Sequence, residues 1–144
     1  MDSKQYLKQA YRLNELIESD MKELKNLRDL ASSISSPQIS DMPHSASRNT
    51  EAPFVKYVGR IVEMEHKINA EIDRYVDLRT EIRTTINDLK NNDEKLLLRY
   101  RYILFMTWEE VAEKLNVSMR TVHRIHGSAL KNLKVPKKMT HNVT

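Results

Sequence analysis

Two arginines one helical turn apart are the residues in this sequence best suited to chemistry. Arg120 and Arg124 fall in residues 118–133, where apolar residues recur at helical spacing on the other side. A guanidinium fork matches the two acceptors that guanine presents in the major groove of DNA, and one bidentate contact contributes about 1–3 kcal/mol of discrimination. We expect both side chains to enter one groove. The alternative, that they only solvate the helix or pair with Glu109, Glu110 or Glu113, stays open at this point.

Other polar side chains of the same region are candidate DNA contacts. Met119 and His123 are predicted to reach base edges beside the two arginines. A second group is suited to phosphate oxygens, contacts to which give affinity and register but no reading of sequence. Its members are Thr107, Ser118, Thr121, Ser128, Lys131 and Lys134. His126 is expected to face solvent.

The elements that must position these residues are predicted to be a helix-turn-helix. Thr107 is suited to cap a helix beginning at Trp108, with Glu110 completing a capping box. Asn116 tolerates the left-handed conformation that ends such a helix, and Ser118 is suited to cap the next one. The predicted buried positions are Trp108, Val111, Ala112, Leu115, Val117, Val122, Ile125, Ala129, Leu130 and Leu133. In a helix-turn-helix the second helix lies in the major groove.

A supporting helix is predicted before this unit, over residues 94–105. Asn91, Asn92 and Asp93 supply its N-cap. Its apolar face is expected to hold Leu96, Leu97, Tyr100, Ile103 and Leu104. Residues 93–135 are therefore predicted to form one small helical domain, followed by a basic tail at 136–144.

Residues 1–92 are predicted to form a long, coiled-coil-like helical hairpin. Helices are expected over residues 4–34 and 54–90, joined by a Ser- and Pro-rich linker at 35–53. The seams that repeat every seven residues are Ala10, Ile17, Leu24 and Ala31 in the first helix, and Phe54, Ile61, Ile68, Tyr75, Ile82 and Leu89 in the second. Asp20 interrupts the pattern. Two helices leave Leu16, Leu30, Val62, Val76 and Leu78 incompletely covered, so a homo-oligomer is expected, with a dimer favoured.

Positive charge is concentrated at the C-terminal end. Residues 1–92 hold 14 Lys and Arg against 15 Asp and Glu, whereas residues 93–144 hold 10 against 5. From Lys114 to the last residue there is no Asp or Glu. Basic charge beside a candidate reading helix favours a polyanionic partner, double-stranded DNA above all. A solvated basic tail is the alternative.

Composition argues against several other classes of protein. There is no cysteine, so disulfides and thiolate metal sites are excluded. We expect no membrane association, since no apolar run approaches the roughly 18 residues of a spanning helix. Two glycines do not make a phosphate-binding loop, and no nucleophile is paired with a base, so neither an enzyme nor a cofactor is expected. His123 and His126 lack a third metal ligand.

Two strings carry a resemblance to known families. The string WEEVAEKLNVSMRTV at residues 108–122, with the apolar positions up to Leu133, resembles the promoter-reading fourth region of bacterial sigma factors. Residues 3–135, and most specifically SDMPHSASRN at residues 40–49, resemble small phage and prophage proteins related to late-gene regulators of the ArpU and RinA type. The resemblance implies promoter binding and control of phage late genes in the bacterial cytoplasm, with host RNA polymerase as a further partner.

The resemblance also indicates base-reading positions, which match Met119, Arg120 and Arg124. Sigma factors carry basic, acidic and amide side chains there, so the operator sequence does not carry over. No segment resembles the sigma regions that melt DNA or grip the polymerase core. The alternatives to a transcription regulator are a small-terminase-like component of phage DNA packaging, or an adaptor whose helical hairpin binds a protein.

Overall fold

All elements of the described chain are helices, which confirms the all-α fold. The computed structural model describes residues 1–35 and 45–137, and the side chains of 1–34 and 54–137. The helices are α1 (Ser3–Ser35), α2 (Ser45–Asn87), α3 (Asn92–Leu98), the π-helical turn η1 (Arg99–Ile103), α4 (Trp108–Leu115) and α5 (Met119–Asn132). Residues 36–44 of the predicted linker and 138–144 of the predicted tail lie outside the described residues.

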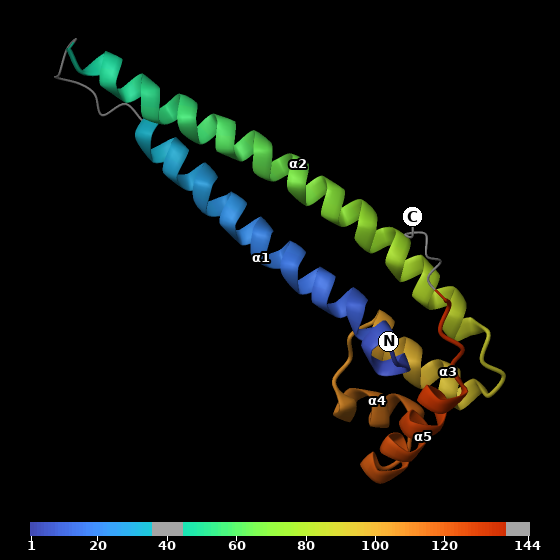
Figure 1. Cartoon of the computed structure of the whole chain (residues 1–144). Helices are drawn as coiled ribbons and strands as arrows, with labels where there is room; N and C mark the ends of the chain where they lie inside the picture. Colours follow the sequence, from blue (N-terminus) through green and yellow to red (C-terminus); the bar gives the residue numbers. More distant parts are fainter. Residues whose placement is uncertain (36–44, 138–144) are drawn as a thin grey trace. The chain divides into compact units, whose positions relative to one another are not determined.

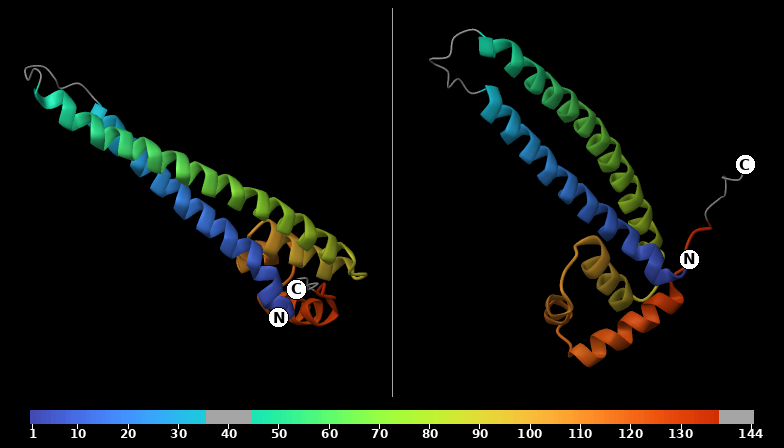
Figure 2. Two further views of the ribbon diagram at one scale, coloured as in Figure 1. Left: turned by 45° about the horizontal axis from the view of Figure 1, so that its top comes forward. Right: turned by 60° about the vertical axis from the view of Figure 1, so that its left-hand side comes forward.

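Helices α1 and α2 run antiparallel as the predicted hairpin, seen from three sides in Figures 1 and 2. Asp2 caps α1, because its Oδ1 accepts the Gln5 N–H at 2.8 Å while Gln5 Oε1 accepts the Asp2 N–H at 3.0 Å. The expected start of α2 near Phe54 is wrong, since the helix begins at Ser45 and passes through Pro53. Residues 45–52 contain neither glycine nor proline, so the helix forms there and loses only the one backbone bond that Pro53 cannot donate.

The chain packs as two compact units whose boundary crosses both long helices. Unit 1 comprises residues 1–13 and 75–144, and unit 2 comprises residues 14–74. The sequence places a boundary at residue 92, where the hairpin ends. The packing instead assigns the first turns of α1 and the last turns of α2 to the same unit as α3, α4 and α5.

Unit 2 is a two-helix seam with charges at its edges. Its buried apolar residues are Ile17, Leu24 and Ala31 from α1 and Ile68 from α2. Arg28 pairs with Glu65 across the hairpin. The seam break at Asp20 is buried, and its Oδ2 lies 3.6 Å from Lys67 Nζ. Burial, followed by the neighbouring Asp20 carboxylate, raises the pKa of Glu71.

Unit 1 holds the main core, to which every one of its helices contributes. Its most deeply buried side chains are Tyr6, Leu7 and Ala10 of α1, Ile82 and Ile86 of α2, Leu97 and Leu98 of α3, Val111 of α4, and Val122 and Ala129 of α5. The Tyr6 hydroxyl donates to Glu81 Oε2 at 2.8 Å and lies 3.1 Å from Thr85 Oγ1. These bonds fix the start of α1 against the end of α2.

The π-helical turn after α3 changes which residues face inward. The Leu104 N–H donates to the Arg99 carbonyl at 3.0 Å, the five-residue spacing of a π-helix. Leu97 and Ile103 are buried as expected, but Leu96 and Leu104 are 37% and 54% exposed. Their predicted burial is wrong, and Leu98 and Tyr102 occupy the core instead. The wider turn rotates the residues that follow Arg99, which accounts for the outward position of Leu104. Phe105, at φ 55, then ends the segment.

The register of this turn predicts losses of stability of different size for two neighbouring substitutions. Ile103→Ala should lower the free energy of unfolding by about 2–5 kcal/mol, since it opens a cavity in the core. Leu104→Ala should cost less than about 1 kcal/mol, because half of that side chain is already in solvent. Urea unfolding followed by circular dichroism measures both. A larger loss for Leu104→Ala would mean that residues 99–104 continue as a regular α-helix.

Candidate nucleic-acid interface

The turn between α4 and α5 has the caps that the sequence predicts. Thr107 Oγ1 accepts the Glu110 N–H at 3.1 Å, and Glu110 Oε1 accepts the Thr107 N–H at 2.9 Å, which completes the capping box. Asn116 has φ 59 and ψ 47, the left-handed conformation that ends α4. Ser118 Oγ accepts the Thr121 N–H at 3.2 Å and so caps α5. These three local features set the angle at which α5 leaves α4.

Helix α5 is amphipathic, and its apolar side is turned into unit 1. Val122, Ile125, Ala129 and, past the helix end, Leu133 are buried as predicted, and Leu130 is half buried. Burial of this side determines which residues of α5 face the solvent. Among them are Arg120, His123, Arg124 and Lys131, all exposed.

The four predicted base-reading residues do not have equal access to solvent. Arg120, His123 and Arg124 are exposed at positions three and four apart, which places them on one face of α5. No ion pair among the described residues involves either arginine, so the alternative of pairing with Glu109, Glu110 or Glu113 is not observed. Met119 is half buried and packs against the core, so only part of it is available to a ligand.

Trp108 of α4 supports the outer face of α5. The centre of its ring lies 5.3 Å from that of His123 and 4.3 Å from the guanidinium carbon of Arg101. Arg101 also donates from Nη1 to the Met106 carbonyl at 2.8 Å. Arg101 is therefore occupied by contacts within the domain, while His123, whose ring is tilted against that of Trp108, stays exposed.

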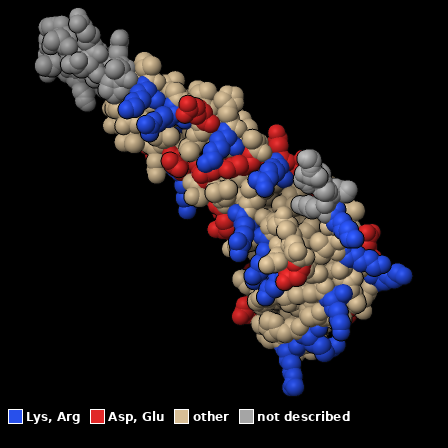
Figure 3. Space-filling view, in the orientation of Figure 1, with Lys and Arg blue, Asp and Glu red and all other residues tan. Residues whose placement is uncertain are grey.

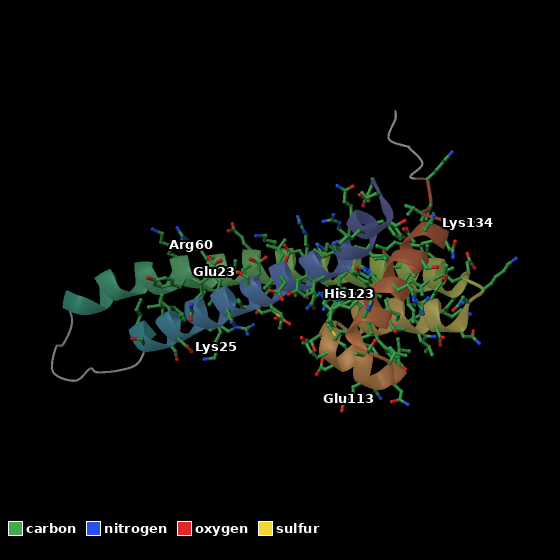
Figure 4. The ribbon with its side chains drawn as sticks, turned by 90° about the horizontal axis from the view of Figure 1, so that it is seen from below. Glu23, Lys25, Arg60, Glu113, His123 and Lys134 are labelled. Atoms are coloured by element: carbon green, nitrogen blue, oxygen red, sulfur yellow. The ribbon has the colours of Figure 1, made fainter. Side chains whose placement is uncertain are left out.

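The predicted phosphate group is distributed along α5 and its flanks. Ser118 and Thr121 lie at its N-terminal end, where the Ser118 hydroxyl donates to Thr121 Oγ1 at 3.1 Å. Thr107 is exposed, and its oxygen serves as the cap of α4. Lys131 is exposed in the last turn of α5. Lys134 follows the end of the helix and, in Figure 4, lies well away from His123.

Among the predicted phosphate-binding residues, Ser128 forms a hydrogen bond with a buried residue of another helix. Its hydroxyl donates to Glu94 Oε2 at 2.6 Å, and Asn132 Nδ2 donates to the same carboxylate at 3.1 and 3.2 Å. Glu94 is only 6% exposed, so these bonds satisfy a buried charged group and hold α5 to α3. The Ser128 hydroxyl is therefore engaged within the domain, and its assignment to phosphate binding stays a prediction. No spacing pattern or motif pointed to Glu94 as a partner of α5.

His126 is buried, so the expectation that it faces solvent is wrong. Its Nε2 lies 2.8 Å from the Tyr102 hydroxyl, and its ring centre lies 4.7 Å from that of Trp108. Burial, with the positive charges of Lys4, His123, Arg101 and Lys8 in that order, lowers the pKa of His126 to about 4. The spacing of residues already indicated that His126 is buried, because it falls between Val122 and Ala129 on the apolar stripe of α5.

Two further properties of the described residues bear on other functions. No cluster of three or more metal-ligating side chains occurs in the part of the chain that the structure describes. Within the same residues no helix is both long and apolar enough to cross a membrane.

The buried imidazole predicts that acid destabilises unit 1. The unfolded chain binds a proton on His126 near pH 6.5, whereas the folded chain does so only near pH 4. The contribution of His126 is thus complete above pH 6.5 and decreases as the pH falls from there toward 4. We expect a loss of about 2 kcal/mol over this range after allowance for solvent screening, measured by urea unfolding.

Two variants separate this effect from acid effects on carboxylates. His126→Gln keeps a hydrogen-bonding side chain beside Tyr102 but does not titrate, so its stability should change less with pH than that of the wild type. The matched control His123→Gln alters the exposed neighbour and should keep the wild-type pH dependence. If His126→Gln and the wild type lose stability in parallel, the assigned cause is wrong.

The comparisons with known proteins give a family but no relative of known activity. The family described as "Protein of unknown function (DUF1492)" matches residues 33–134, which include the last residues of α1 and all of α2, α3, η1, α4 and α5. No curated protein and no solved structure matches the chain. Because the match spans more than half of the sequence, the chain belongs to the DUF1492 family.

Proposed function

We propose that this protein binds double-stranded DNA sequence-specifically through α5 and regulates transcription. The observation that carries the proposal is the outer face of α5, where Arg120, His123 and Arg124 are exposed on a helix whose other side is fixed in a core. A helix fits the major groove, and an arginine fork is the commonest specific reader of guanine. The resemblance to late-gene regulators supports phage late promoters as the targets, with host RNA polymerase as a second partner.

The charge of the domain is consistent with a DNA ligand. On the face seen in Figure 3, Lys and Arg side chains outnumber Asp and Glu over the C-terminal helices. Residues 114–144 include Arg120, Arg124, Lys131 and Lys134 and no carboxylate side chain. Phosphate contacts of this kind release counterions, so the affinity should fall steeply as salt concentration rises.

The hairpin supports a proposal of self-association. Leu16, Leu30, Val62 and Val76 are each about half exposed, between 46% and 53%. Exposed apolar residues at this density on a coiled-coil-like hairpin favour burial against a second copy. A dimer would present two α5 helices to two half-sites on one DNA molecule.

Replacing the two arginines tests the reading role of α5. Arg120→Ala/Arg124→Ala should abolish preference for the selected site, a loss of about 1–3 kcal/mol of discrimination per bidentate contact. Helix content and assembly should be unchanged, because both side chains are exposed. The site is obtained by selecting bound fragments from the source genome, and affinities for it and for a scrambled duplex are measured by fluorescence anisotropy.

The matched control is Arg60→Ala/Arg83→Ala, which removes two exposed arginines from α2. It should retain the wild-type preference for the selected duplex. A double mutant of α5 that still selects the same fragments would contradict the assignment of Arg120 and Arg124. Failure of the wild type to bind any duplex at low salt would favour the adaptor hypothesis.

Polar substitution of the hairpin tests self-association. Leu16→Gln/Val62→Gln should shift the protein toward the monomer, because it removes apolar surface that a second copy would bury. Light scattering measures the mass of the wild type and of the variant, with Glu18→Gln/Glu63→Gln as a control at exposed polar positions. A monomeric wild type would contradict this part of the proposal, and a closed ring of many subunits would favour DNA packaging over regulation.

A further inference from the structure

Three cations are spaced four residues apart at the start of α1. Lys4, Lys8 and Arg12 occur at successive turns, so they form one stripe along a single face of the helix. All three side chains are exposed. Tyr6, Leu7 and Ala10, on the other side of the same turns, are buried in the core of unit 1. The core therefore fixes the direction in which the stripe points.

The stripe belongs to the same compact unit as α5. Residues 1–13 pack with residues 75–144, and Tyr6 is hydrogen bonded to Glu81 and Thr85 of α2. The positive charges of Lys4 and Lys8 also contribute to the lowered pKa of His126 in the middle of α5. In both views of Figure 2 the start of α1 lies beside the C-terminal end of α5, and Figure 4 shows the same helices with their side chains.

A surface groove lies along the stripe. Its volume is about 430 Å³, and Lys8 and Arg12 line it together with Tyr11, Arg101, Phe105 and Thr107. The Tyr11 and Phe105 rings meet edge to face at 5.3 Å, which packs the wall of the groove. Thr107 also belongs to the phosphate group predicted from the sequence. No carboxylate lines this groove, so it suits an anionic ligand.

In the part of the chain that the structure describes, no carboxylate forms an ion pair with the stripe. None of the ion pairs among the described residues involves Lys4, Lys8 or Arg12. Two acidic residues of unit 1 close to these turns already have partners, since Asp2 accepts the Gln5 N–H and Glu81 accepts the Tyr6 hydroxyl. Like charges at i and i+4 on a helix repel one another by roughly 0.2–0.5 kcal/mol per pair, and a bound polyanion would relieve this repulsion.

We propose that Lys4, Lys8 and Arg12 bind the phosphate backbone of the DNA whose bases α5 reads. The inference rests on the proposed function and extends it, because it makes the first helix of the chain a part of the DNA interface. Lysine and arginine contacts to phosphates provide affinity and orientation without reading bases. Both segments of unit 1, residues 1–13 and the C-terminal helices, therefore contribute to DNA binding. A fragment that lacks α1 should lose DNA affinity and also part of the hydrophobic core.

The test is the salt dependence of duplex binding by the full chain. Lys4→Gln/Lys8→Gln/Arg12→Gln should lower the slope of log affinity against log salt by about 2–3, at roughly 0.9 per phosphate contact. Affinity should fall on the order of 10- to 100-fold, equally for the selected site and for a scrambled duplex. The control Lys22→Gln/Lys56→Gln/Arg60→Gln makes the same change of charge at exposed positions of unit 2.

Each outcome decides either the inference or the function on which it rests. The inference is supported if only the α1 variant changes the slope and site preference is retained. It is overturned if the α1 variant keeps the wild-type slope, or if the control lowers the slope equally. If the wild-type protein binds no duplex at low salt, both the proposed function and this inference are wrong. The charge-conserving variant Lys4→Arg/Lys8→Arg/Arg12→Lys must keep the wild-type slope, so that a loss of folding is not mistaken for a loss of contacts.

Discussion

Burial of the apolar side of α5 is the constraint on which the rest of unit 1 depends. Val122 and Ala129 have no exposed surface, and this fixes the rotation of the helix about its axis. Once that rotation is set, Arg120 and Arg124 must face away from the core. A rigid support of this kind matters for recognition, because a side chain held in one place loses less entropy on binding than a mobile one.

The core that holds α5 is built from both ends of the sequence. Tyr6 and Leu7 of α1 are as deeply buried as Val111 of α4, so the first turns of the chain are part of the C-terminal domain. The same packing that stabilises α5 places the start of α1, with its three cations, in one compact unit with that helix. Stability and the proposed DNA surface therefore depend on one set of contacts, and a change in the core should weaken both.

Polar groups inside unit 1 are satisfied by partners on other helices. Glu94 of α3 is bound by Ser128 and Asn132 of α5, and His126 is bound by Tyr102 of η1. Buried polar groups need such partners, because an unsatisfied one costs about 1–3 kcal/mol. These bonds also specify how α5 sits on its support, which apolar packing alone specifies less sharply.

The residues alone specify the local structure around the turn, because the caps at Thr107 and Ser118 and the left-handed Asn116 depend on neighbours within four residues. The apolar side of α5, with the buried position of His126, also follows from helical spacing, which reports burial directly. The π-helical turn and the bond between Ser128 and Glu94 became apparent only from the packing. Those features arise from contacts between residues far apart in sequence or from a change of helical period, and a regular spacing pattern contains neither.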